Sequence, residues 1–220
     1  MIIEERIIDA DFRNPTVTAL RDEADIICTN PPFSLFREFI KWINPDEKQF
    51  IVIGSIGAIC YKDIFPLIKN NKLWLGIVGG AKEYIQPDGT LKKMGNTCWF
   101  TNIVHNHRIT PMVLLPKSVH EANGAVYQKY DNYDAIEVPE LKLLPSDYSG
   151  VMGVPISFLD RYNPDQFEII TCACGNSWAN YKDALISLNY NDSIPSRGGT
   201  PVLDGKLMYT RILIRKKTNS

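Results

Sequence analysis

The string Thr29-Asn30-Pro31-Pro32-Phe33 constrains the fold more than any other part of the chain. Each proline fixes its own φ and lacks an N–H group. Asn30 and Pro31 each precede a proline, which keeps both residues out of the helical region. A strand that enters this turn must therefore end there, and the unpaired backbone groups of the turn are carbonyl oxygens.

The residues on either side of the turn predict a strand and a helix. Ala24 to Thr29 is a short apolar run that is typical of a buried strand. Ser34 to Ile43 carries apolar residues at helical spacing, and Ser34 is a suitable N-cap. The turn therefore lies at the carboxyl end of a strand in an α/β sheet, which is where such sheets bind ligands.

Strand and helix signals alternate through the first half of the chain. Further strands are predicted over 49–55, 73–78 and 98–104, and a further helix over 61–71. This alternation is typical of a parallel α/β sheet. The last two strands are joined by a polar loop, so we expect them to pair antiparallel at an edge.

The sequence pattern changes near Pro111, beyond which proline and glycine recur and helical periodicity is weak. We place a domain boundary here, with one domain over residues 1–115 and a C-terminal region over 116–220. We expect the C-terminal region to be an irregular α+β segment that ends in a strand from Leu207 to Arg215.

Composition excludes several classes of protein. The chain has 24 Lys and Arg against 25 Asp and Glu, so bulk charge does not hold it on nucleic acid, although a local basic groove is compatible. The apolar runs are too short to cross a bilayer, and no signal peptide is expected. Five scattered cysteines predict a reducing, cytoplasmic location rather than a disulfide scaffold.

Two of the cysteines, Cys172 and Cys174, are close in sequence. They have no second Cys or His pair at the spacing of a zinc site. From the sequence we therefore expect packing or a free thiol at these positions and no metal site.

The proline turn has a specific chemical use. The Asn30 side-chain oxygen and a proline carbonyl form two acceptors at fixed spacing, and an exocyclic amino group offers two matching donors. When both N–H bonds are held, the nitrogen loses conjugation with its ring and its lone pair can attack an electrophile. The Phe33 ring could stack on the flat substrate. The alternative is a rigid strand-to-helix turn that binds nothing.

The turn and its surroundings resemble a known family. N-P-P-F looks like the amino-methyltransferase motif of S-adenosylmethionine-dependent DNA adenine-N6 enzymes, and the longer context is similar to the EcoRI-type adenine-specific DNA methyltransferases over about residues 9 to 172. The strings that carry the resemblance are Asp11–Arg13, Ala24–Phe36, Tyr61–Lys69, Leu73–Gly76, Trp99–Asn102, Lys129–Val138 and Gly150–Pro155.

The resemblance implies a reaction and roles for the N-P-P-F residues. A methyl group would pass from S-adenosylmethionine to N6 of an adenine that is flipped out of double-stranded DNA. Asn30 and Pro31 would accept hydrogen bonds from the N6 amino group, Pro32 would complete the motif, and Phe33 would stack on the base.

The resemblance also implies a cofactor site and DNA contacts. Asp11 and Phe12 would line the adenine side of the S-adenosylmethionine pocket, and Tyr84 is a candidate for the aromatic that closes the other face of the target base. No metal is required, because the sulfonium is already a strong methyl donor. A basic segment could contact DNA phosphates through Arg211, Arg215, Lys216 and Lys217.

The sequence departs from the family in one respect. Such enzymes have a glycine-rich cofactor loop before N-P-P-F, whereas the first glycine of this chain is Gly54. We therefore expect a Rossmann-like methyltransferase sheet without its first strands, inactive by itself or completed by a separate chain that supplies the loop.

Two alternatives remain open at the level of sequence. The chain could be a non-catalytic DNA-binding remnant or a subunit of a split methyltransferase. It could also be an amino-methyltransferase that acts on RNA or on a protein amide, because N-P-P serves those chemistries as well.

Overall fold

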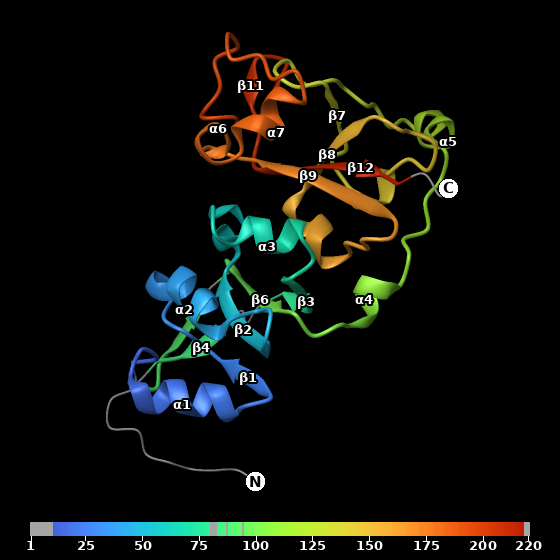
Figure 1. Ribbon diagram of the computed structural model, residues 1–220. Coiled ribbons are helices and arrows are strands. Elements are labelled where there is room, and N and C mark those ends of the chain that lie inside the picture. Colours follow the sequence, from blue (N-terminus) through green and yellow to red (C-terminus); the bar gives the residue numbers. More distant parts are fainter. Residues whose placement is uncertain (1–10, 80–82, 87, 94, 218–220) are drawn as a thin grey trace.

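The computed structural model describes residues 11–79, 83–86, 88–93 and 95–217 (Figure 1). The described residues form two four-stranded sheets and two short two-stranded ones, surrounded by helices. The expected mixed α/β class is therefore confirmed. Among the described residues, no helix has the length and apolar character that would let it span a bilayer.

The first sheet has the strand order β1-β2-β6-β3. β1 runs parallel to β2, whereas β6 is antiparallel to both β2 and β3. The predicted antiparallel pairing of the last two strands is confirmed, but β6 inserts between β2 and β3, so the sheet is mixed. The strands are β1 (Ile26–Thr29), β2 (Gln49–Ser55), β6 (Thr97–Thr101) and β3 (Trp74–Gly79).

The helix after the proline turn begins later than predicted. The Leu35 N–H donates to the Pro32 carbonyl at 3.0 Å, which starts the 3-10 turn η1 (Phe33–Leu35) before α2 (Phe36–Ile43). The expected N-cap, Ser34, is wrong, because it lies inside η1 and Leu35 occupies the cap position of α2. The apolar face of α2 is buried as predicted, through Phe36, Phe39, Ile40 and Ile43.

The other helical segments of the first half are short. The predicted helix over 61–71 is reduced to α3, and its neighbours were not predicted. These segments are α1 (Pro15–Glu23), η2 (Ile56–Cys60), α3 (Phe65–Lys69) and α4 (Asn106–Ile109).

The C-terminal region is more regular than expected. It contains a second four-stranded sheet of order β7-β8-β12-β9, in which β7 and β8 are parallel and β12 is antiparallel to both β8 and β9. The strands are β7 (Ala135–Glu137), β8 (Val151–Pro155), β9 (Phe167–Ala173) and β12 (Arg211–Lys216).

Smaller elements connect these strands. Two of them form a hairpin between β3 and β6, and the others lie in the C-terminal region. They are β4 (Glu83–Ile85), β5 (Leu91–Lys93), α5 (Lys117–Ala122), η3 (Leu141–Leu143), η4 (Ile156–Asp160), α6 (Ser177–Asn180), α7 (Lys182–Ile186), β10 (Val202–Leu203) and β11 (Lys206–Leu207).

One apolar core runs through both sheets. It contains side chains of α2 and of β2 from the first sheet together with side chains of η4 and of β8 and β9 from the second sheet. α3 lies between the sheets and packs against β9 (Figure 1). Division into two domains near residue 115 stays a prediction. The side chains at the centre of this shared core include Phe36, Phe50, Phe100, Met152, Phe158 and Phe167.

A buried ion pair crosses the second sheet. The Arg211 guanidinium donates to both carboxylate oxygens of Glu137, at 2.8 Å from its terminal nitrogen and 3.1 Å from Nε. The two side chains are only 11% and 6% exposed. The Tyr130 hydroxyl also donates to Glu137. Removing either charge would leave the other buried without its partner, which is strongly destabilising.

We therefore expect Glu137→Gln to lower the free energy of unfolding by about 3–5 kcal/mol, because Arg211 stays buried without its counter-charge. Urea denaturation measures the change. Glu140→Gln is the matched control, because Glu140 pairs with Lys142 at the surface. That change should be below about 1 kcal/mol. Equal effects of the two substitutions would contradict the assignment of the Glu137 pair as buried.

Candidate functional site

A cavity of about 640 Å³ lies beside β1 at the edge of the first sheet. Its walls are α1, β1, the proline turn and one side of α2. Among the described strands β1 pairs only with β2, and Ile26 on β1 is 52% exposed. Most of the lining is apolar and comes from Phe12, Val17, Leu20, Ile26, Ile27, Leu35, Phe39 and Trp42.

The proline turn contributes acceptors to this cavity. β1 ends at Thr29, and the next three residues, Asn30, Pro31 and Pro32, line the wall. Asn30 is exposed, and within the described ranges no group hydrogen-bonds to its side chain or donates to the Pro31 carbonyl. Pro31 is buried, but it lines the cavity, so the turn places two acceptors, adjacent in the chain, beside a space that a ligand with two N–H groups could occupy.

Phe12 forms part of the cavity's base. Its ring is buried and meets Phe39 edge-on at a centroid distance of 5.1 Å and Trp42 at 5.5 Å. These contacts fix the ring, because aromatic pairs prefer edge-to-face geometry at this separation. Phe12 therefore offers a rigid apolar surface to a ligand.

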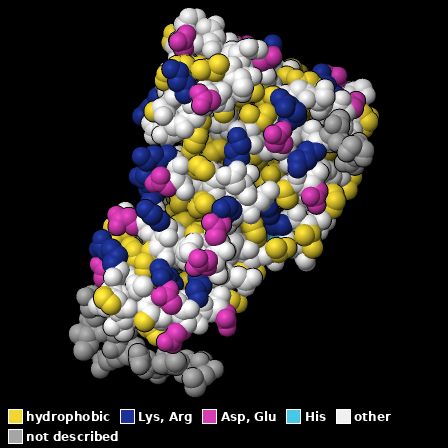
Figure 2. All heavy atoms as spheres, in the orientation of Figure 1, with side chains coloured by type: hydrophobic (Ala, Val, Ile, Leu, Met, Phe, Trp, Pro, Cys, Tyr) yellow, Lys and Arg dark blue, Asp and Glu magenta, His cyan; other side chains and the backbone are white. Residues whose placement is uncertain are grey.

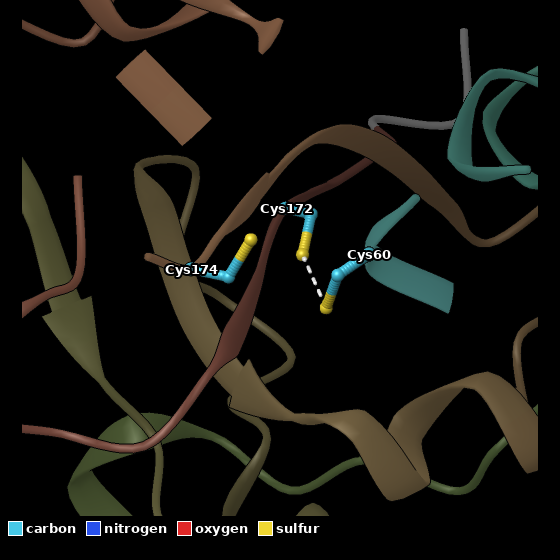
Figure 3. Close-up of side chains that lie close together, drawn as sticks. All are labelled: Cys60, Cys172 and Cys174. Atoms are coloured by element: carbon cyan, nitrogen blue, oxygen red, sulfur yellow. Dashed lines mark hydrogen bonds between the residues drawn. The ribbon is translucent and has the colours of Figure 1, made fainter. Parts of the chain in front are cut away.

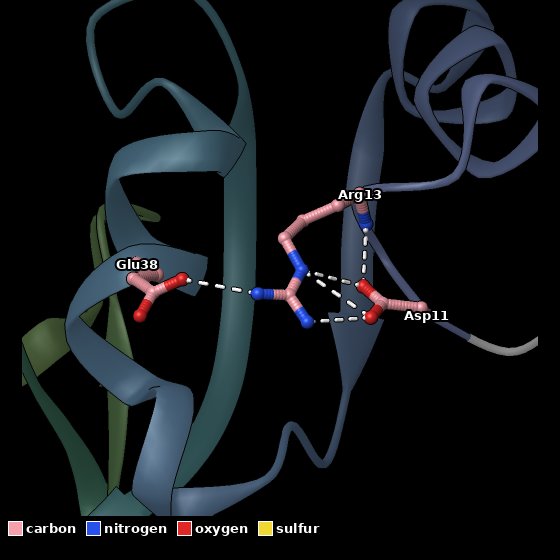
Figure 4. Close-up of polar contacts among 3 residues, drawn as sticks. All are labelled: Asp11, Arg13 and Glu38. Atoms are coloured by element: carbon pink, nitrogen blue, oxygen red, sulfur yellow. Dashed lines mark hydrogen bonds and ion pairs between the residues drawn. The ribbon is translucent and has the colours of Figure 1, made fainter.

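Asp11 lies at the rim of the cavity as a paired anion. Arg13 donates to its carboxylate from Nε (2.9 Å) and from a terminal nitrogen (2.6 Å), and also reaches Glu38 of α2 at 3.5 Å (Figure 4). These hydrogen bonds from Arg13 lower the pKa of Asp11 to about 2. Asp11 is therefore ionised at neutral pH and places a negative charge at the rim of the cavity.

α1 closes the cavity and is tied to the end of α2. Asn14 caps its first turn by accepting from the Thr16 N–H at 2.9 Å. The Arg21 guanidinium donates to the Trp42 carbonyl at 2.6 Å and lies 5.1 Å from the centre of the Trp42 ring. Trp42 in turn donates from Nε1 to Thr18 at 3.2 Å. These contacts hold the two helices at a fixed separation.

The structure brings together five of the residues that the sequence singled out, since Asp11, Phe12, Asn30, Pro31 and Pro32 all line the cavity. α1 was not predicted from the sequence. Its start has a recognisable signal, an Asn at the N-cap followed by Pro15 at the first helical position.

Two other candidates lie outside the cavity wall. Phe33 is half-buried in η1. Tyr84 is half-buried on β4, and its hydroxyl is buried with no hydrogen-bond partner among the described residues. The roles assigned to these two rings stay predictions.

The basic candidates follow or belong to β12, in the second sheet, and none lines the cavity. Arg211 is held by Glu137, whereas the Arg215 side chain is 48% exposed and lies 3.8 Å from Glu168. Lys216 is half-buried and Lys217 is exposed. Basic and acidic side chains are interspersed over the face in Figure 2.

Three cysteines converge at a different place, between the two sheets. Cys60 ends η2, and its sulfur lies near those of Cys172 and Cys174 (Figure 3). Cys60 is 112 positions from Cys172, so sequence spacing could not link them. Within the described part of the chain, this is the one group of three or more residues with metal-ligating side chains close together.

Comparison with known proteins assigns nearly the whole chain to one family. The model for the family described as adenine-specific methyltransferase EcoRI matches residues 3–217. Type II methyltransferase M.EcoRI of Escherichia coli is 39% identical over 95% of this chain. Type II methyltransferases M.MpnI of Mycoplasma pneumoniae and M.MgeORF184P of Mycoplasma genitalium are 35% and 34% identical over 96% and 95% of it.

The chain spans only part of each relative. It covers 63% of the length of M.EcoRI and 70% of the other two. No solved structure gave a significant match.

The ion pair between Arg13 and Asp11 at the rim can be tested by mutation. Arg13→Gln should raise the pKa of Asp11 from about 2 towards its ordinary value of 3.8, because the donors that stabilise the carboxylate are removed. A depressed native pKa favours the folded state above pH 3.8, and this contribution is lost as the pH falls through 2. Titration of the carboxyl by NMR measures the midpoint.

The matched control is Arg37→Gln, which removes an exposed pair with Asp63 elsewhere on the surface. It should leave the midpoint of Asp11 unchanged. An unshifted midpoint in Arg13→Gln would show that Arg13 does not hold this carboxylate.

Proposed function

The chain belongs to the EcoRI family of adenine-specific methyltransferases, and we propose that it carries the base-receiving site of a site-specific DNA adenine-N6 methyltransferase. The observation that carries the proposal is the turn after β1, where Asn30 and Pro31 offer two unoccupied acceptors beside a cavity. All three relatives are named type II methyltransferases, which supports the same reaction class.

The chemistry proposed for the turn follows from its rigidity. The Asn30 amide oxygen and the Pro31 carbonyl accept the two N6 protons of a flipped adenine, so the N6 lone pair is withdrawn from the ring and directed outward. Because the φ of Pro31 is fixed, the acceptors need little reorganisation when the base arrives. Phe33, at the start of η1, stacks on the base and holds its plane.

The family implies S-adenosylmethionine as the methyl donor. The cavity residues fit part of this cofactor, because Phe12 and Phe39 form an apolar surface for a flat ring system and ionised Asp11 places a negative charge at the rim. We propose that Asp11 and Phe12 hold its adenine end. The bound cofactor supplies an electrophilic methyl group, and the protein supplies position and exclusion of water.

The methionine end of such a cofactor calls for a close backbone approach, which glycine permits. No glycine precedes Gly54 in the sequence, and the edge of β1 away from β2 is unpaired among the described strands. We propose that a further strand of a Rossmann-like sheet pairs with this edge and brings a glycine-rich loop, from the same protein or from a separate chain. The exposed Ile26 on β1 supports this arrangement.

Double-stranded DNA is the partner we propose. Arg215, Lys216 and Lys217 are candidates for phosphate contacts, because Arg215 and Lys217 are exposed and carry charge that a phosphate can bind. Arg211 is left out, because its guanidinium is engaged by buried Glu137.

The experiment that tests the function uses this chain together with the segment or chain that supplies the glycine-rich loop. It measures methyl transfer from radiolabelled S-adenosylmethionine to unmethylated plasmid DNA, with RNA and protein as competing acceptors. We expect the label in N6-methyladenine of the DNA. Label in RNA or in protein amides would favour the other amino-methyltransferases. DNA binding without transfer, by a protein that binds the cofactor, would favour the non-catalytic alternative.

Asn30→Ala should lower methyl transfer by about 10²–10³-fold, the usual effect of removing one oriented hydrogen-bonding group from an active site. Binding of the cofactor, measured by calorimetry, should stay unchanged. Asn30→Asp keeps an acceptor oxygen at the same place and should retain more activity than the alanine variant. An equal loss of transfer and of cofactor binding would argue against the role of Asn30.

Phe33→Ala should weaken transfer through the loss of a stacking contact, which contributes about 1–3 kcal/mol per base, or roughly 5- to 150-fold. Phe33→Tyr keeps an aromatic face and should be close to the unchanged protein. Steady-state kinetics with DNA as the varied substrate measures the difference. If the alanine and tyrosine variants behave alike, the ring does not stack on the base.

A further inference from the structure

Three cysteine sulfurs lie together at the junction of the two sheets (Figure 3). Cys60 comes from η2, directly after β2 of the first sheet, whereas Cys172 and Cys174 come from β9 and the residue that follows it in the second. The Cys60 and Cys172 sulfurs are 3.6 Å apart, and all three lie within 4.8 Å of one another. The fold therefore gathers thiols from two distant parts of the chain.

These separations suit a metal ion. Zinc binds cysteine sulfur at about 2.3 Å, which places two sulfurs of a tetrahedral site roughly 3.8 Å apart. The Cys60–Cys172 separation of 3.6 Å is close to this value, and no two of the three sulfurs are more than 4.8 Å apart. Small rotations of the side chains would therefore suffice to close the three sulfurs around an ion.

Ser177, at the start of α6, orients one of the sulfurs. Its hydroxyl oxygen lies 3.4 Å from the Cys174 sulfur, accepts from the Cys174 N–H at 2.7 Å and donates to the Cys172 carbonyl at 2.6 Å. Such outer contacts are typical of metal sites, in which they orient the direct ligands. Cys172 and Cys174 are buried, whereas Cys60 is only partly buried. Cys60 is thus the least buried of the three, so a water molecule that serves as fourth ligand would enter on its side.

We propose that Cys60, Cys172 and Cys174 bind one zinc ion that links the first sheet to the second. A disulfide would join two of these sulfurs and leave the third unused, whereas a soft metal ion uses all three. The cluster does not line the cavity beside β1, so the ion has a structural role and takes no part in methyl transfer.

Cadmium titration of the full chain tests the proposal. The protein is reduced with a phosphine, freed of metal with a chelator, and titrated while the thiolate-to-cadmium charge-transfer absorption is recorded. We expect saturation at one ion per chain. Cys60→Ser should remove about a third of the absorption and weaken zinc binding roughly 10- to 100-fold in competition with a chromogenic chelator.

Two other cysteines provide matched controls. Cys28→Ser changes an exposed thiol and Cys98→Ser a buried one, and neither belongs to the cluster. Both variants should keep the full absorption and affinity. Equal losses in these controls, or no stoichiometric absorption in the unchanged protein, would overturn the proposal.

A second measurement needs no variant and so does not depend on the variants folding. Zinc should protect Cys60, the partly buried member of the cluster, from alkylation in the native protein while the exposed Cys28 still reacts, as read by peptide mass spectrometry. A Cys60–Cys172 disulfide in the isolated protein that re-forms after reduction in the presence of zinc would instead identify a redox pair. Unchanged alkylation of Cys60 with and without zinc would also contradict the site.

Discussion

The end of β1 at the proline turn is the constraint on which the first half of the structure depends. Pro31 and Pro32 have no N–H groups, so the ladder with β2 stops at Thr29 and the chain turns into η1 and α2. The register of α2 then follows, with its apolar face towards the sheet. The same turn leaves the Asn30 amide and the Pro31 carbonyl without partners among the described residues. The missing N–H groups of the two prolines thus determine where α2 begins, form one wall of the cavity and leave two acceptors beside it.

The cavity combines rigid walls with an open edge. Aromatic contacts and the bonds from Arg21 and Trp42 fix α1 against α2, so the side that the described residues form is already ordered before any ligand binds. The opposite side, along β1, has no described strand beside it. This asymmetry suits a site in which the proline turn of this chain receives the base. As we propose, a glycine-bearing strand completes the site along β1.

The sequence predicted the parts whose cause is local. β2 was predicted at its observed bounds, and the buried face of α2 was predicted because strand runs and helical spacing are short-range signals. Of the second sheet, only β12 was predicted, by the strand expected over 207–215, which begins four residues too early. β7, β8 and β9 were missed, because the sheet is built from pairings between segments far apart in the sequence, such as β8 with β12. Cys60 was missed for the same reason. Of the candidate site, Asp11, Phe12 and the Asn30–Pro32 turn could be found from motifs. The internal pairing of Arg211 depends on tertiary contacts.

A crystal structure of the protein bound to a duplex that it methylates, with the target adenine unmodified, tests the role of the proline turn. We expect an adenine outside the helix, with N6 about 3 Å from both the Asn30 amide oxygen and the Pro31 carbonyl. An adenine that stays stacked in the duplex, or that is flipped into a pocket away from this turn, would contradict that role.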